Sequence, residues 1–212
     1  MSFKMKFETK YLIRWGIPGW ILIFWLFYEI LFLKGINPLN TKMVDIKTGL
    51  TLLLSLTAIG VPVGYLLHQI YFGSSWVINS NKNYVKIARK IPNFPRPDGW
   101  GQNKNEDYFH FEYVWHAMLI NRDAETRTYL EGRYRHLLGT IHALGALFIS
   151  SMLSLIMTAI IIFTHLSEFG YNVYFWVGLI LQVIIFVASA LNYKYYSDNL
   201  RAFQIKMLQT YL

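Results

Sequence analysis

The chain contains no cysteine, and only 15% of its 212 residues are charged. Without cysteine there can be no disulfide, no thiolate metal site and no cysteine nucleophile. A soluble domain of this size usually carries about 25% charged residues. The sequence therefore excludes thiol chemistry and favours a membrane protein over a soluble one.

The sequence also lacks the common motifs of catalysis. It has no Gly-rich phosphate loop, no convincing Ser-His-Asp arrangement and no paired carboxylates in an apolar segment. The gaps between His110 and His116 and between His136 and His142 are both six residues, which places each pair on different faces of a helix. We therefore predict a protein that is not an enzyme, with no catalytic residue, cofactor or metal. A His-dependent metal enzyme of the membrane is the second alternative.

Four apolar stretches are long enough to cross a bilayer: 13–33, 48–72, 137–163 and 172–192. A hydrocarbon core of about 30 Å needs about 20 helical residues. The N-terminal tail holds four Lys and Arg residues, the first loop three, the second loop ten, the third loop none and the C-terminal tail three. Loops rich in Lys and Arg stay in the cytoplasm. We therefore predict an all-α, multi-pass protein of the cell membrane with four transmembrane helices, both termini cytoplasmic and a cytoplasmic helical extension between the second and third spans.

The span pattern divides the chain into three regions: 1–72 with the first two spans, a basic cytoplasmic region at 73–136, and 137–212 with the last two spans and the C-terminal tail. Two short apolar runs within 74–90 suggest a hairpin, and the alternative is a helix that leaves the membrane. Residues 106–136 read as one helix that runs on into the third span without a strong breaker.

Small residues mark two predicted helix contacts. Gly60 and Gly64 have the Gly-x-x-x-Gly spacing that lets two helices approach closely in lipid. An i, i+4 stripe of small and hydroxyl residues lies in the third span: Ala146, Ser150, Ser154 and Thr158. We predict that both sets lie at a pore or at an interface between subunits. Packing within one subunit is the alternative.

Two polar side chains fall inside predicted spans. Glu29 lies about one turn from the outer end of the first span, where we expect it to reach water or to pair with Lys34. The alternative role for Glu29 is a pore or proton-relay carboxylate. Gln182 lies in the middle of the fourth span, and a lone amide in lipid needs a protein partner.

The net charge of +8 is concentrated on the predicted cytoplasmic side. Arg127, Arg133, Arg135 and His136 form a basic collar below the third span. Such a collar favours binding to anionic lipid headgroups, or to a soluble cytoplasmic protein. No motif supports binding to nucleic acid.

These observations together predict a homo-oligomeric, channel-like or membrane-perturbing module that is regulated through its basic cytoplasmic region. The plan is similar in architecture to small membrane effectors of prokaryotic antiviral defence, which is a resemblance of architecture alone. The alternative is a membrane anchor or assembly subunit that recruits a soluble partner. Ion flux in liposomes distinguishes the two.

Overall fold

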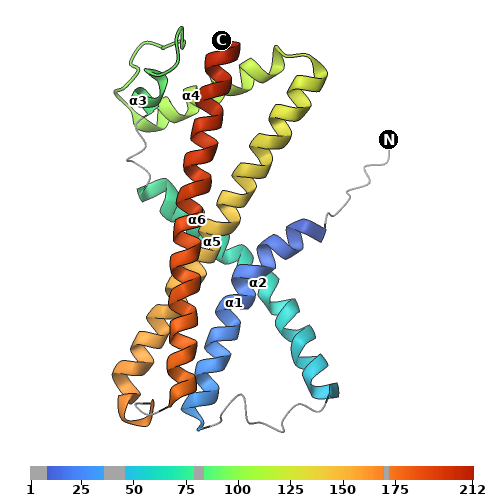
Figure 1. Ribbon diagram of the computed structural model, residues 1–212, viewed down its shortest axis with the longest axis vertical. Coiled ribbons are helices and arrows are strands. Elements are labelled where there is room, and N and C mark those ends of the chain that lie inside the picture. Colours follow the sequence, from blue (N-terminus) through green and yellow to red (C-terminus); the bar gives the residue numbers. More distant parts are fainter. Residues whose placement is uncertain (1–8, 36–45, 79–83, 170–171) are drawn as a thin grey trace. The chain divides into compact units, whose positions relative to one another are not determined.

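The computed structural model describes residues 9–35, 46–78, 84–169 and 172–212, and over these ranges the chain is helical with no strand. The helices are α1 (Thr9–Leu33), α2 (Ile46–Ile78), α3 (Tyr84–Ala88), α4 (Lys104–Ile120), α5 (Ala124–Phe169) and α6 (Val173–Tyr211) (Figure 1). The prediction of an all-helical chain is thus confirmed for the described residues. The hairpin predicted within 74–90 is wrong, because α2 runs on to Ile78 and α3 is also helical.

Three helices are long and apolar enough to cross a membrane. They contain the segments Arg14–Leu33, Ala124–His165 and Val173–Tyr211. The last two have 42 and 39 residues, about twice the length that a hydrocarbon core requires. The chain therefore has the composition of a membrane protein, and α5 and α6 have residues to spare beyond a span.

The chain divides into two compact units. Unit 1 comprises Met1–Tyr71 and His142–Asn192, and unit 2 comprises Phe72–Ile141 and Tyr193–Leu212. The last twenty residues therefore belong with the region predicted to be the cytoplasmic extension. From the sequence we group them with the last two spans in the region 137–212, because contacts to residues far away in the chain leave no local signal.

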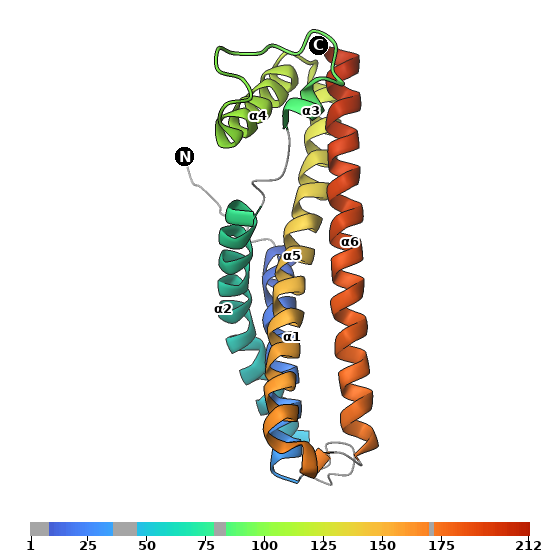
Figure 2. The same cartoon turned by 90° about the vertical axis from the view of Figure 1, so that its left-hand side faces the viewer.

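In unit 1, α1 crosses α2 and lies beside the C-terminal part of α5 (Figures 1 and 2). The crossing places Gly19 of α1 on Gly60 and Gly64 of α2. A Cβ at Gly19 would lie 1.9 Å from the Gly60 carbonyl oxygen, and a Cβ at Gly64 would lie 1.6 Å from the Trp15 carbonyl oxygen. Only glycine permits backbones to approach this closely.

Unit 2 has an aromatic and aliphatic core built around α4. Phe111, Val114, Trp115 and Met118 are buried on one side of this helix, and they pack with a set from other elements: Ile87, Ala88, Ile91, Phe94, Leu130 and Leu208. Glu112 accepts hydrogen bonds from Tyr134 of α5 (2.8 Å) and from Gln204 of α6 (3.2 Å). The carboxylate of Glu112 therefore links the three helices of this core.

The helix predicted over 106–136 is two helices. α4 ends at Ile120, and the side chain of Asp123 accepts a hydrogen bond from the Thr126 backbone amide (2.9 Å) at the start of α5. An Asp in this position satisfies an amide that has no partner within the helix. The same hydrogen bond holds the pKa of Asp123 below its ordinary value. From Ala124 onward, the predicted continuity into the third span is confirmed.

Candidate functional site in the membrane unit

A carboxylate lies buried among the apolar helices of unit 1. Glu29 of α1 is only 1% exposed. Its neighbours in the sequence are large apolar and aromatic residues, and Glu29 is the only acidic residue of unit 1 whose side chain the structure describes. The expectation that Glu29 reaches water or pairs with Lys34 is wrong, since its side chain is buried and its hydrogen bonds are to neutral groups.

Two uncharged polar side chains meet Glu29. Thr158 of α5 forms a hydrogen bond with Glu29 Oε1, and its hydroxyl lies 2.7 Å from Gln182 Oε1 of α6. Gln182 Nε2 lies 3.2 Å from Glu29 Oε1. We call these three residues the Glu29 cluster. It connects α1, α5 and α6 through polar atoms in a region where lipid would offer none.

The second carboxylate oxygen of Glu29 has no partner. Among the described residues, Glu29 Oε2 is buried and makes no hydrogen bond. A buried carboxylate oxygen without a donor costs free energy, because it has lost water and gained nothing in exchange. The cluster is therefore incomplete as a set of hydrogen bonds within the protein.

The predicted stripe of small residues faces α1 of the same chain. Ala146, Ser150, Ser154 and Thr158 are all buried. The Ser150 hydroxyl donates to the Pro18 carbonyl of α1 (2.6 Å), and the Ser154 hydroxyl donates to the Ser150 carbonyl (3.0 Å). The stripe ends at Thr158 in the Glu29 cluster. Gly60 and Gly64 likewise contact α1 within one chain, as the crossing shows.

The basic residues predicted to bind lipid or a partner lie near the start of α5 in unit 2. Arg127, Arg133, Arg135 and His136 are all exposed. Arg135 lies 3.5 Å from Glu131, four residues earlier on the same helix. At about 100° per residue, the four residues are distributed around the helix and do not share one face. The collar therefore presents positive charge on several sides of α5.

The histidines do not gather into a metal centre. In the described ranges, no group of three His, Asp and Glu side chains could hold an ion. His116 lies 3.9 Å from Glu112, and His110 hydrogen-bonds the Pro95 carbonyl (2.9 Å). These contacts fix the position of side chains on α4.

The sequence contained partial signals for the Glu29 cluster. A carboxylate, a threonine and a glutamine each fell within a predicted apolar span, and polar groups in such spans usually find each other. Nothing in the order of residues says which of them meet, because Glu29 is 129 residues from Thr158 and 153 from Gln182. Only the packing of α1 against α5 and α6 identifies the site.

The fold and the cluster define an all-helical chain with three apolar helices of membrane-spanning length around a buried carboxylate. Comparison with family models, curated proteins and solved structures finds no match to this chain. Its function must therefore be argued from its own geometry.

Proposed function

We propose that this chain is a multi-pass protein of the cell membrane with four spans and both termini in the cytoplasm. Three helices have suitable length and hydropathy, and α2, with 33 residues, is long enough for a fourth span. Seventeen of the twenty Lys and Arg residues then lie on the cytoplasmic side.

The absence of cysteine makes this topology simple to test, because one introduced cysteine has no background. Val173→Cys, at the start of α6, should react with a membrane-impermeant maleimide in intact cells. Gln102→Cys, in the loop before α4, should react only after the cells are opened. Both residues are exposed. A protected Val173→Cys would contradict the four-span topology.

Within this topology, we propose a homo-oligomeric, channel-like module whose conduction depends on Glu29. The observation that supports this function is the buried carboxylate among three apolar helices, with one oxygen lacking a partner. An ionisable side chain within a membrane span costs free energy, and such residues commonly mark ion or proton paths. A purely structural span would be more stable with an apolar residue at this position.

The course of α5 and α6 through both units supports regulation through the cytoplasmic region. α5 and α6 carry Thr158 and Gln182, and each of these helices also contributes residues to unit 2. A ligand that binds unit 2 would therefore act on the same two helices that hold Glu29. We propose that anionic lipid headgroups are such ligands and that the collar of Arg127, Arg133, Arg135 and His136 binds them.

The flux test uses the full chain in liposomes, with dyes for internal pH and for K⁺. Glu29→Gln should lose most of the flux, because Gln keeps the size and polarity of the side chain but cannot ionise. Glu125→Gln removes an exposed carboxylate at the start of α5 and should conduct as the wild type does. Equal flux through Glu29→Gln and the wild type would overturn the role of Glu29. A single-chain mass in native mass spectrometry would overturn the oligomeric part of the proposal.

A second candidate function is a membrane anchor that recruits a soluble protein, and the surface of α4 favours it. Phe109, Tyr113 and Ile120 are strongly exposed, Tyr113 at 69%. At about 100° per residue, these three positions share one face of the helix. The opposite face carries Phe111, Trp115 and the rest of the core. An exposed apolar stripe on a helix whose other face is already buried is typical of a binding surface.

The recruitment test places a photo-crosslinking residue on that stripe. A benzoylphenylalanine at Tyr113 should capture a soluble protein in cells, whereas the same group at Glu125 should not. The captured band should be lost on Ile120→Ser, which interrupts the stripe at an exposed position. Equal capture at Tyr113 and Glu125 would show that the stripe has no specific partner.

A further inference from the structure

The contacts around Thr158 contain too few hydrogens. Its hydroxyl oxygen lies within hydrogen-bond distance of three oxygens: Glu29 Oε1, Gln182 Oε1 and the Ser154 carbonyl. A threonine hydroxyl has one hydrogen to donate. Two of these three oxygen pairs therefore have no hydrogen of their own if Glu29 is ionised.

Reversing the Gln182 amide does not remove the shortage. The oxygen and nitrogen of a Gln side chain are assigned from the hydrogen-bond network, so the opposite orientation must also be considered. In that orientation the Gln182 nitrogen donates to Thr158, but the Gln182 oxygen then faces Glu29 Oε1 across 3.2 Å. That pair of oxygens again needs a hydrogen.

One added proton gives a hydrogen to each of the three contacts among the side chains of Glu29, Thr158 and Gln182 in either orientation, and it leaves only the contact of Thr158 with the Ser154 carbonyl without one. If Glu29 is a neutral acid, its O–H donates to Thr158, and Thr158 donates onward to Gln182. In the reversed orientation, the same O–H donates to the Gln182 oxygen. Protonation also removes the charge, whose burial is the largest cost in the cluster.

Among the side chains of unit 1 that the structure describes, no positive one offers an alternative. Apart from Glu29, the fully charged side chains described there are those of Arg14 and Lys34. Arg14 precedes Glu29 by fifteen residues, about 22 Å along the helix, and the exposed Lys34 follows the end of α1. From α5 and α6, the groups that face Glu29 are the uncharged Thr158 and Gln182. The hydrogen bonds of Glu29 are to these two residues. The other titratable side chains described in this unit are those of Tyr28, Tyr65, His68, Tyr71, His142, His165 and Tyr174.

We propose that the Glu29 cluster is a proton-binding site, in which Glu29 holds a proton at neutral pH and shares it with Thr158 and Gln182. The site takes a proton because it supplies oxygen acceptors from three helices and too few hydrogens to join them. This inference rests on the proposed function for its membrane setting and names the proton as the species bound there.

The test is infrared spectroscopy of the purified full chain in lipid nanodiscs, recorded at neutral pH and low salt in H₂O and in D₂O. A protonated buried carboxyl group gives a C=O stretching band separate from the amide bands. We expect this band in the wild type and in Glu125→Gln, and its loss in Glu29→Gln. A wild-type spectrum without a band that depends on Glu29 would overturn the proposal. Loss of the band on adding Na⁺ or K⁺ at constant pH would also overturn it, because a metal cation would then be the preferred ligand.

A second variant keeps the test decisive if Glu29→Gln does not fold. Thr158→Val is close to the wild type in volume but removes the hydroxyl at the centre of the network. The carboxyl band should shift in frequency, because the acid loses its hydrogen-bond partner. An unmoved band would overturn the assignment of the proton to this cluster. A band that behaves as expected in a protein without flux would refute the channel function and leave the proton site standing. Flux through a protein that lacks the band would refute the proton site and leave the channel function standing.

Discussion

The crossing of α1 and α2 makes a sharp prediction for Gly64. A methyl group there would lie 1.6 Å from the Trp15 carbonyl oxygen and 3.2 Å from the Gly19 amide nitrogen. Carbon and carbonyl oxygen normally stay at least about 3.3 Å apart. The clash is with backbone atoms, which cannot rotate away as a side chain can. Gly64→Ala must therefore push the two helices apart.

The size of the effect follows from two opposing contributions. Overpacking a close contact costs about 1–3 kcal/mol, and a backbone clash belongs near the upper end of that range. Replacing Gly by Ala inside a helix stabilises the folded state by about 0.5–1 kcal/mol, because the unfolded chain becomes less flexible. We expect Gly64→Ala to be destabilised by about 2 kcal/mol, which is more than tenfold in the folded-to-unfolded ratio.

Gly73 provides the matched control on the same helix. A Cβ at Gly73 meets nothing within 4 Å, so Gly73→Ala should be neutral or slightly stabilising. The measurement is unfolding in mixed SDS micelles, followed by the fluorescence of tryptophans such as Trp15 and Trp20 beside the crossing. If Gly64→Ala is as stable as Gly73→Ala, the close approach of α1 and α2 does not exist in the membrane.

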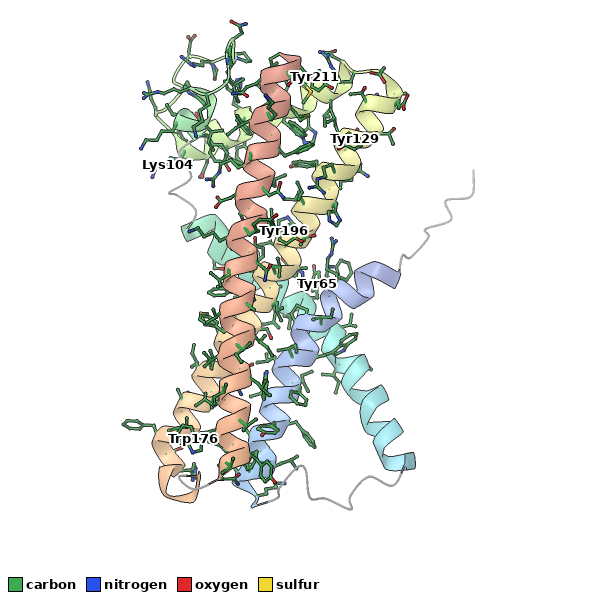
Figure 3. The ribbon with its side chains drawn as sticks, in the orientation of Figure 1. Tyr65, Lys104, Tyr129, Trp176, Tyr196 and Tyr211 are labelled. Atoms are coloured by element: carbon green, nitrogen blue, oxygen red, sulfur yellow. The ribbon has the colours of Figure 1, made fainter. Side chains whose placement is uncertain are left out.

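Three further outcomes are expected. Trp115→Ala should cost unit 2 about 3–5 kcal/mol, because this side chain is fully buried, whereas Tyr129→Ala should change its thermal stability little, since Tyr129 (labelled in Figure 3) is 68% exposed. The first amides of α5 should lose protection from hydrogen exchange in acid. The pKa of Asp123 is lowered in the folded state, so its stabilisation is complete above the ordinary pKa of an aspartate and is lost as pH falls through the lower, folded value. Asp123→Asn keeps a capping oxygen without a charge and should remove this pH dependence. If the variant loses protection in acid as the wild type does, another group causes the pH dependence. Ser150→Leu should disrupt the contact of α5 with Pro18, and a variant that runs as a stable, monodisperse species in detergent would contradict the burial of this stripe.

Local sequence was sufficient for the helical class and for the apolar helices. α1, α5 and α6 contain three of the four segments predicted from hydropathy, apart from Asn172, and α2 contains the fourth. A backbone in lipid must satisfy its hydrogen bonds within its own helix. The length and composition of each segment therefore decide locally that it forms an apolar helix. Two local features were missed. The cytoplasmic helix is interrupted before the cap at Asp123, and α2 continues to Ile78 where a short apolar run suggested a strand.

What the sequence determined by itself is thus a set of apolar helices and the uneven distribution of charge between them. Tertiary structure alone decided that Glu29 meets Thr158 and Gln182, that the glycines of α2 lie against α1, and that Tyr193–Leu212 join unit 2. A polar residue in an apolar helix needs a partner, but many residues along a long chain could supply one. The choice depends on which helix faces pack together, and that is a property of the whole fold rather than of any segment.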